Sequence, residues 1–302
     1  MITSIRKLEP RSIWNHFSDL NAVPRPSKKE ERVIQFMMNF GKKLHLKTIV
    51  DTVGNVIITK PATKGFENRK TIVMQSHLDM VHQKNSETVF DFETDGIRMH
   101  IDGDWVSADG TTLGADNGLG VASIMAILSS NDIQHPPIEP LFTIDEETGM
   151  TGAMGLKGGI LKGEILLNLD TEEDDEIDMG CAGGIDVTAT RNYTEVSAPK
   201  ETIAFRVSIK GLQGGHSGMD IHKGFGNANK IMNRLLYYGF EHVNLQIAEL
   251  EGGSLRNAIP RESFSTILVD KTSKETFLSV MNEMANSIKD EFKTIEPNLT
   301  IG

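Results

Sequence analysis

Short apolar runs alternate with helix-like stretches in the first part of the chain. The apolar runs that predict strands are residues 55–59 (NVIIT), 71–75 (TIVMQ), 140–144 (PLFTI) and 164–169 (EILLNL). Residues 27–44 begin with Ser27 as the expected N-cap and repeat apolar residues at spacings of three and four, and residues 119–130 are almost wholly apolar, so both stretches predict helices. Strands of this kind alternating with helices predict an α/β fold, with a mainly parallel sheet and helices on both faces.

The pattern changes after residues 181–186 (CAGGID). The later part predicts strands at 202–209, 243–250, 263–269 and 298–302, and helices at 226–239 and 274–292. The order strand, helix, strand, strand, helix, strand is typical of a small ferredoxin-like α+β domain. We therefore predict two domains, over residues 1–184 and residues 185–302.

Composition narrows the class of protein. The chain has 302 residues, enough for two domains, and a net charge of −11 without a basic patch, which argues against nucleic acids and anionic membranes as partners. Its one cysteine, Cys181, excludes an internal disulfide and fits a reducing cytosol. The early charges do not resemble a signal peptide, and no apolar run approaches the roughly 20 residues of a membrane helix. These features predict a soluble, cytoplasmic protein.

Polar side chains stand where three predicted strands end and where one helix begins. In chain order they are His77 and Asp79, then Asp116 with Asn117 before the helix, then Asp145, Glu146 and Glu147, and finally Asp170. In open α/β sheets the carboxyl ends of the strands form the ligand-binding crevice. One imidazole and several carboxylates meeting there would suit Zn²⁺ or Mn²⁺.

Each of these residues alone has a simpler interpretation. His77 and Asp79 would be a structural hydrogen-bonded pair, Asp116 a helix N-cap, and the glutamates and Asp170 exposed carboxylates in loops. Taken together, carboxylates gathered in one crevice would repel each other and raise each other's pKa unless a cation were present. The combination therefore favours a metal site.

Other catalytic motifs are absent or incomplete. The sequence has no HExxH, CxxC or Walker loop. Residues 215–219 (GHSGM) miss the GxSxG pattern of serine hydrolases because Met219 occupies the last position. Cys181 has no supporting signature and is interpreted as a small packing residue.

Seven motifs occur in an order that points to one family. They are SHLDMV, LGADNGLGVA, IDEETGMTGA, NLDTEE, GCAGG, GLQGGHSGMDI and NAIPRE, and they span residues 76 to 262. In this order they resemble the aminoacyl-histidine dipeptidases, which belong to the dizinc metallopeptidase family that also contains carnosinases, aminoacylases and tripeptidases. The resemblance implies a zinc-peptidase-like catalytic domain followed by a ferredoxin-like lid.

The resemblance also implies a ligand for each metal. His77 and Asp170 would bind the first metal, Glu147 the second, and Asp116 would bridge the two. The peptide bond between Asp116 and Asn117 would be cis. Two zinc ions are implied, with manganese or cobalt as substitutes.

Catalytic roles follow from the same resemblance. Asp79 would hydrogen-bond His77 from behind, and Glu146 would act as general base on a water held between the metals. In the second domain His216 would stabilise the oxyanion, and Asn257 would contact the substrate.

The expected function is metal-dependent hydrolysis of dipeptides, with Xaa-His as the expected class, by a homodimer formed through the lid domain. The family pattern continues beyond residue 302 to a further histidine that completes the ligands of the second metal, so we expect a truncated form whose own catalytic competence is open. The alternatives are a deacylase or tripeptidase with the same metal core, and a metal-binding or dimerisation fragment without turnover.

Overall fold

The computed structural model describes residues 2–171, 175–180, 183, 185 and 187–302. Its contacts divide the chain into two compact units, Met1–Cys181 and Ala182–Gly302. Each unit has a hydrophobic core of its own. Within the described ranges, no helix is long and apolar enough to cross a membrane. The boundary predicted after residue 184 stays a prediction, and the interpretation of Cys181 falls outside the described residues.

Unit 1 is built on a five-stranded sheet of mixed direction. Its strands are β1 (Lys47–Val50), β2 (Val56–Thr59), β3 (Ile72–His77), β6 (Ile138–Thr143) and β7 (Ile165–Asn168), and their spatial order is β1-β2-β6-β3-β7. Strands β6, β3 and β7 are parallel, whereas β1 and β2 add an antiparallel edge. The predicted α/β class is confirmed, and the three parallel strands end at the same edge of the sheet.

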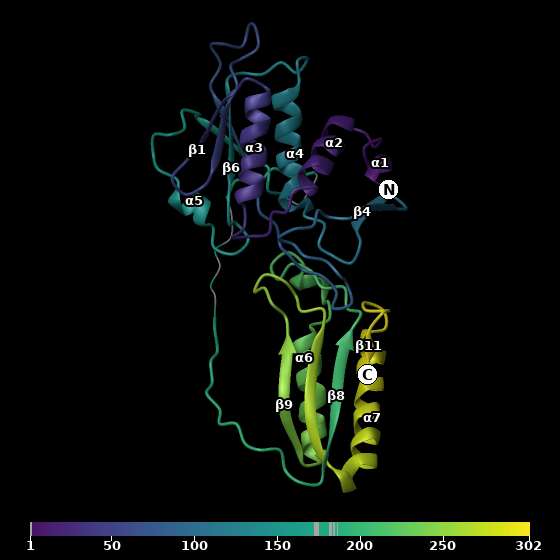
Figure 1. The fold of residues 1–302 in the computed structure, drawn as a ribbon. Coiled ribbons are helices and arrows are strands. Elements are labelled where there is room, and N and C mark those ends of the chain that lie inside the picture. Colours follow the sequence, from purple (N-terminus) through teal and green to yellow (C-terminus); the bar gives the residue numbers. More distant parts are fainter. Residues whose placement is uncertain (1, 172–174, 181–182, 184, 186) are drawn as a thin grey trace. The chain divides into compact units, whose positions relative to one another are not determined.

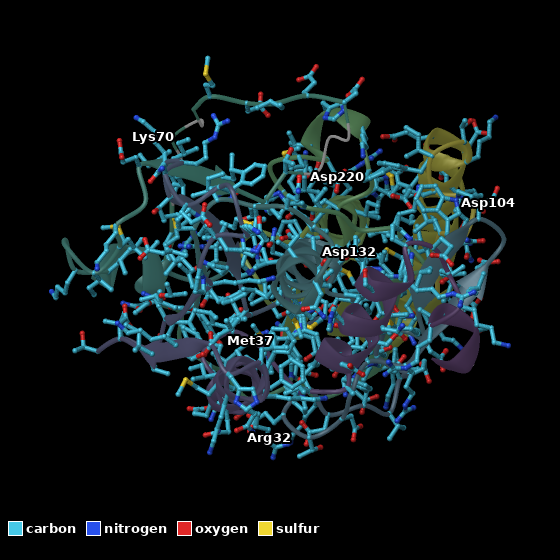
Figure 2. The ribbon with its side chains drawn as sticks, turned by 90° about the horizontal axis from the view of Figure 1, so that it is seen from above. Arg32, Met37, Lys70, Asp104, Asp132 and Asp220 are labelled. Carbon is cyan, nitrogen blue, oxygen red and sulfur yellow. The ribbon has the colours of Figure 1, made fainter. Side chains whose placement is uncertain are left out.

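Helices α3 (Glu31–Lys43) and α4 (Ala115–Ser129) lie along the sheet (Figure 1). Their apolar side chains share one core with the strands, as Met37 does from α3, while Arg32 of the same helix is exposed (Figure 2). The other face packs against apolar residues of 156–161, which follow the short helix α5 (Thr151–Gly155).

A second small core in unit 1 lies beside the sheet. It joins α1 (Ile2–Ile5) and α2 (Arg11–Asn21) to the hairpin of β4 (Met99–Asp102) and β5 (Trp105–Ala108). This core packs partly against α4, because buried Ala122 belongs to it.

The predicted N-cap of the first long helix is wrong. Helix α3 begins at Glu31, and its N-cap residue is Glu30 rather than Ser27. Lys28 adopts a left-handed conformation with φ 69°, which turns the chain before the helix starts. The Ser27 hydroxyl is thereby directed to Asp79, to which it donates a hydrogen bond of 2.8 Å.

Unit 2 has the predicted ferredoxin-like order. It consists of β8 (Thr202–Lys210), α6 (Ala228–His242), β9 (Leu245–Gly252), β10 (Ser263–Asp270), α7 (Lys274–Phe292) and β11 (Thr300–Ile301), with short 3-10 helices at Ile221–Lys223 and Lys271–Ser273. The antiparallel sheet has the order β11-β8-β10-β9, so β9 is an edge strand. Helices α6 and α7 pack on the sheet through Leu235, Ile267 and Ile288, which are fully buried.

Candidate metal centre

The carboxyl ends of the three parallel strands bring the predicted ligands of unit 1 together. His77 is the last residue of β3, Glu146 and Glu147 follow β6, and Asp170 follows β7, while Asp116 lies at the start of α4. Ligand atoms of His77, Asp116 and Asp170 lie within 4.8 Å of one another, and so do those of His77, Glu146 and Glu147. His77 is therefore common to two groups of potential metal ligands.

The imidazole of His77 is buried and held from behind. Its Nδ1 lies 3.1 Å from the main-chain oxygen of Asp79, which can only accept, so Nδ1 carries a proton and Nε2 faces the carboxylates. Nε2 lies 3.0 Å from Asp116 Oδ1 and 3.6 Å from Asp170 Oδ1. Burial lowers the pKa of His77, but hydrogen bonds to Asp116, Asp170 and Asp79 outweigh it and raise this pKa well above its usual value.

Asp79 links the histidine to the glutamate pair. Its Oδ1 lies 3.3 Å from His77 Nδ1 and accepts a hydrogen bond of 3.1 Å from the main-chain N–H of Glu146. Its Oδ2 accepts from the Glu147 main-chain N–H at 3.2 Å and from Ser27. Burial raises the pKa of Asp79, but the hydrogen bond and charge of His77, with the other donors, bring this pKa below its usual value. Asp79 is therefore an ionised support for both sides of the site.

A tight turn places Asp116. Gly114, in the left-handed region at φ 69°, precedes it, and the peptide bond between Asp116 and Asn117 is cis, as the resemblance implies. The Asn117 side-chain amide donates to the Leu169 carbonyl at 2.8 Å and to Asp170 Oδ1 at 2.5 Å. Asn117 thereby joins the turn that carries Asp116 to the end of β7.

The two glutamates titrate abnormally because of where they lie. Burial first, and then the charges of Asp116, Glu146 and Asp79, together raise the pKa of Glu147 to about 8 against the opposing charge of His77. The pKa of Glu146 is also raised, first by burial and then by Asp170, Asp79 and Asp116, against the charge of His77. A divalent cation would relieve this repulsion, and an imidazole with four carboxylates is a suitable donor set, so the residues fit the implied metals.

Three residues of the segment 25–30 (RPSKKE) hydrogen-bond the segments that carry the candidate ligands, and the sequence did not predict this role for them. The buried Arg25 guanidinium donates to the main-chain oxygens of Leu78 and Asp79, both at 3.1 Å. Glu30 Oε1 accepts from the Asp145 main-chain N–H at 3.1 Å, and Ser27 is the donor to Asp79 described above. A single sequence carries no signal for these contacts, since the segment has the composition of an ordinary helix start.

Unit 2 brings the other two predicted residues into adjacent loops. The Ser217 main-chain N–H donates to the Asn257 carbonyl at 2.8 Å, so the loops of His216 and Asn257 lie side by side. His216 Nδ1 accepts from the main-chain N–H groups of Gly218 at 3.1 Å and Met219 at 3.2 Å. A neutral His216 therefore carries its proton on Nε2 and presents an N–H donor.

Two acidic side chains anchor the His216 loop within unit 2. Glu296, 2% exposed, accepts from the main-chain N–H groups of Gln213 and Gly226, each at 2.8 Å. Asp220 Oδ2 accepts from the His216 main-chain N–H at 2.7 Å. The loop is thus held at its base and directly at the histidine.

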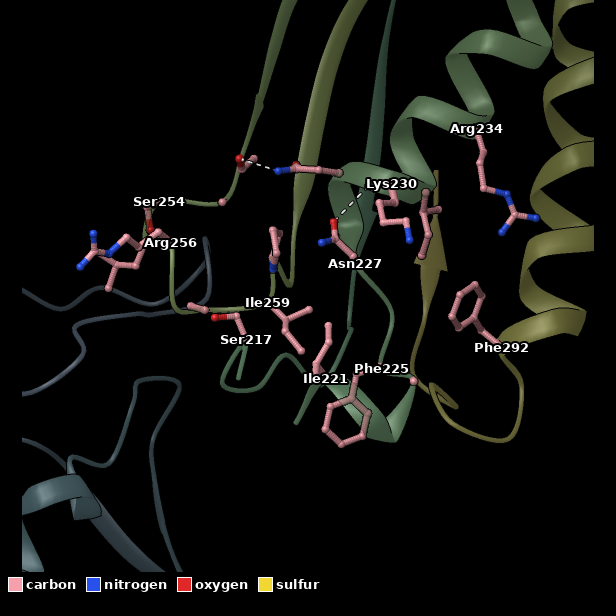
Figure 3. A pocket seen from close by; sticks show the side chains of 18 of the residues that line it. Ser217, Ile221, Phe225, Asn227, Lys230, Arg234, Ser254, Arg256, Ile259 and Phe292 are labelled. Atoms are coloured by element: carbon pink, nitrogen blue, oxygen red, sulfur yellow. Dashed lines mark hydrogen bonds between the residues drawn. The ribbon is translucent and has the colours of Figure 1, made fainter. Parts of the chain in front are cut away.

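A pocket of about 690 Å³ adjoins these loops at the N-terminal end of α6 (Figure 3). Ser217 and Ile259 line it on the side of the loops, and Lys230 and Arg234 line it from the helix. Arg234 is paired with Glu291 by two hydrogen bonds of 3.1 and 2.7 Å, and Arg256 adds a third cationic side chain to the lining of the pocket.

Comparisons with known proteins agree with the motifs. Residues 207–296 match the model of the peptidase dimerisation domain. The cytosol non-specific dipeptidase of Escherichia coli K12 is 45% identical over 300 residues, which are 99% of this chain and 62% of that protein. Peptidase T of Haemophilus influenzae is 28% identical over 183 residues, covering 50% of this chain and 44% of that protein.

A solved structure gives the same relationship. The crystal structure of aminoacylhistidine dipeptidase from Vibrio alginolyticus is 45% identical, with a TM-score of 0.59, and the match covers 99% of this chain and 61% of that one. The chain therefore spans about three fifths of the length of these two relatives. The identity extends along nearly the whole chain and the match to the peptidase dimerisation domain falls in unit 2, so the chain is similar to these dipeptidases over both units.

Proposed function

We propose that this protein hydrolyses dipeptides with two divalent metal ions, and that Xaa-His dipeptides are its substrate class. The carrying observation is the convergence of His77 with three carboxylates that follow strand ends and with Asp116 at the start of α4, in a chain 45% identical to a dipeptidase and to an aminoacylhistidine dipeptidase. In this proposal His77 and Asp170 would hold the first metal, Glu147 would hold the second, and Asp116 would be shared between the two. Zinc is the proposed metal, with manganese or cobalt as substitutes. When bound, the metals would polarise the scissile carbonyl and acidify the attacking water.

Glu146 is the proposed general base. Its main-chain N–H is fixed by Asp79, and its raised pKa brings proton transfer closer to neutral pH. The water oxygen attacks the scissile carbonyl carbon as its proton passes to Glu146. The carbon–nitrogen bond then breaks, and Glu146 returns the proton to the leaving amine.

His216 and Asn257 are proposed to act on the substrate from unit 2. The Nε2–H of neutral His216 is a suitable donor for the oxyanion that develops on the carbonyl, because Nδ1 already accepts two hydrogen bonds. Asn257 lies in the adjacent loop and is proposed to bind the substrate. A cytoplasmic location is proposed as well, since the E. coli relative is named a cytosol dipeptidase.

The proposal is tested by metal analysis together with a substrate panel. The chain, loaded separately with Zn²⁺, Mn²⁺ and Co²⁺, is assayed against Xaa-His and other dipeptides, tripeptides and N-acyl amino acids. We expect two metals per chain and turnover of dipeptides, with Xaa-His preferred. If only tripeptides or only N-acyl amino acids were hydrolysed, the protein would be a tripeptidase or a deacylase that uses the same metal core. A chain that binds metal without any turnover, or binds none, contradicts the proposed activity.

A homodimer formed through unit 2 is proposed on three observations. The dimerisation-domain match covers residues 207–296, and β9 is one of the two edge strands of the sheet. Beside that edge, Ile247, Leu250, Tyr237 and Phe240 are 53 to 64% exposed and line one groove. An apolar face next to an unpaired strand edge is a surface that a second copy can cover.

The double variant Phe240→Glu with Leu250→Lys is expected to convert the dimer to a monomer, because it places charges in the apolar groove. Light scattering after gel filtration measures the mass, at several protein concentrations. Leu166→Lys, a matched change at a 62% exposed leucine of unit 1, is the control and should remain dimeric. A wild-type monomer, or a double variant that stays dimeric, would rule out this surface.

A further inference from the structure

Arg25 is a buried cation whose donors reach three segments of unit 1. It is 1% exposed, and its Nη1 donates to the main-chain oxygens of Leu78 and Asp79. Its Nη2 donates to the Gly114 carbonyl at 2.6 Å and to Asn21 Oδ1 at 2.9 Å. One guanidinium thus connects the turn after β3, which follows His77, to the turn before α4, which leads to Asp116.

The glycines of the motif LGADNGLG leave room for this guanidinium. A Cβ atom added to either Gly114 or Gly118 would lie 2.6 Å from Arg25 Nη2, closer than any real contact allows. The positive φ of 69° at residue 114 favours glycine there independently of Arg25, whereas residue 118 has no positive φ that would require a glycine. A Cβ atom at residue 118 would also lie 2.8 Å from the ring of Phe17, so contact with Arg25 and Phe17 accounts for the absence of a side chain at Gly118.

Burying the charge of Arg25 is costly, which makes a purely stabilising role a poor explanation. Moving a guanidinium out of water carries a large desolvation penalty, and apolar residues of similar volume often give an equal or more stable core. Burial lowers the pKa of Arg25 to about 10, with Asp79, Asp116 and Glu147 opposing, so the side chain remains a cation at neutral pH. The rigid, planar donor fork is suited to holding several carbonyls in one arrangement.

We propose that Arg25 is a positioning residue, which fixes the turn after His77 to the turn before Asp116 and so sets the geometry in which these two side chains meet a metal. The inference rests on the proposed metal centre and adds to it a residue that contacts no metal. It predicts that disturbing the guanidinium weakens metal binding in chains that are still folded.

The test is titration of the metal-free chain with Co²⁺, followed by visible absorption, which reports both affinity and ligand geometry. Arg25→Lys keeps the charge but not the fork, and Gly118→Ala keeps the arginine but displaces its Nη2. We expect both variants to bind Co²⁺ about 10- to 100-fold more weakly, the usual effect of losing a support behind metal ligands, and to show altered absorption bands. Arg98→Lys is the matched control, because Arg98 is 56% exposed and should change neither readout.

Folding is followed separately through tryptophan fluorescence, since both tryptophans, Trp14 and Trp105, lie in unit 1. A purely structural role predicts a lower urea midpoint with unchanged Co²⁺ affinity and spectrum in the folded chain, and that result overturns the inference. If Arg25→Lys does not fold, Gly118→Ala carries the test, measured in chains that the fluorescence shows to be folded, because its methyl group also meets the ring of Phe17. A wild-type chain that binds no Co²⁺ overturns the metal centre itself, which distinguishes that failure from the failure of Arg25.

Discussion

Replacing Glu146 by glutamine is expected to lower kcat for dipeptide hydrolysis by about 10²- to 10⁴-fold, the usual contribution of a positioned general base. The amide preserves the size of the side chain and leaves the main-chain hydrogen bond from residue 146 to Asp79 in place. It cannot take a proton from water at any accessible pH. The proposed ligands, His77, Asp116, Glu147 and Asp170, are unchanged, so metal content should remain that of the wild type.

The comparison that makes this prediction sharp is between kcat, KM and bound metal. Loss of kcat with unchanged KM and two bound metals supports a base that acts in the transition state. Glu164→Gln, at a surface glutamate paired with Lys70, is the control for a change of one charge in unit 1. If Glu146→Gln instead lost a metal, Glu146 would be a ligand, a role that its position in one group with His77 and Glu147 permits. Undiminished turnover would exclude both roles.

Much of the centre could be predicted because strand ends are visible in the sequence. Apolar runs locate β3, β6 and β7, and the rule that parallel strands end at one edge then brings His77, Glu147 and Asp170 together. The fold of unit 2 was predictable for a related reason, since two amphipathic helices and alternating strands permit few arrangements. The chain order alone then predicts the ferredoxin-like sheet that the structure contains.

What could not be predicted depends on contacts between residues far apart in the chain. Ser27 has the sequence context of an N-cap, but its hydroxyl lies next to Asp79, 52 residues away. The hairpin of β4 and β5 has strands of four residues, and in β4 only Met99 is buried, so its alternation is too short to recognise. The tautomer of His216 likewise depends on two main-chain N–H groups whose directions only the folded loop defines.

Replacing Glu147 by glutamine is expected to flatten the pH dependence of stability in the metal-free protein. The pKa of Glu147 is raised to about 8 by burial, with neighbouring carboxylates adding to the effect, whereas an unfolded glutamate titrates near 4.3. Between these values the native state holds a proton that the unfolded chain has released. The stability that this proton contributes is complete below about pH 4.3 and is lost as pH rises through about 8, with a slope of at most about 1.4 kcal/mol per pH unit.

Urea unfolding in EDTA at pH 5, 6.5 and 8, followed by tryptophan fluorescence, measures this slope in unit 1, where both tryptophans lie. The difference between the two proteins should be smallest at pH 5, and the Gln variant should be the more stable of the two at pH 8. Its slope should not vanish, because the raised pKa of His77 also removes stability as pH rises above 6.5. The surface change Glu93→Gln should leave the profile of the wild type intact.

Since a metal must displace the Glu147 proton, Zn²⁺ binding at pH 7 should release protons from the wild type and fewer from the variant. If the free energies of unfolding of the two proteins changed with pH in parallel, the Glu147 carboxyl would already be ionised in the metal-free protein. Relief of carboxylate repulsion at Glu147 would then not contribute to metal binding.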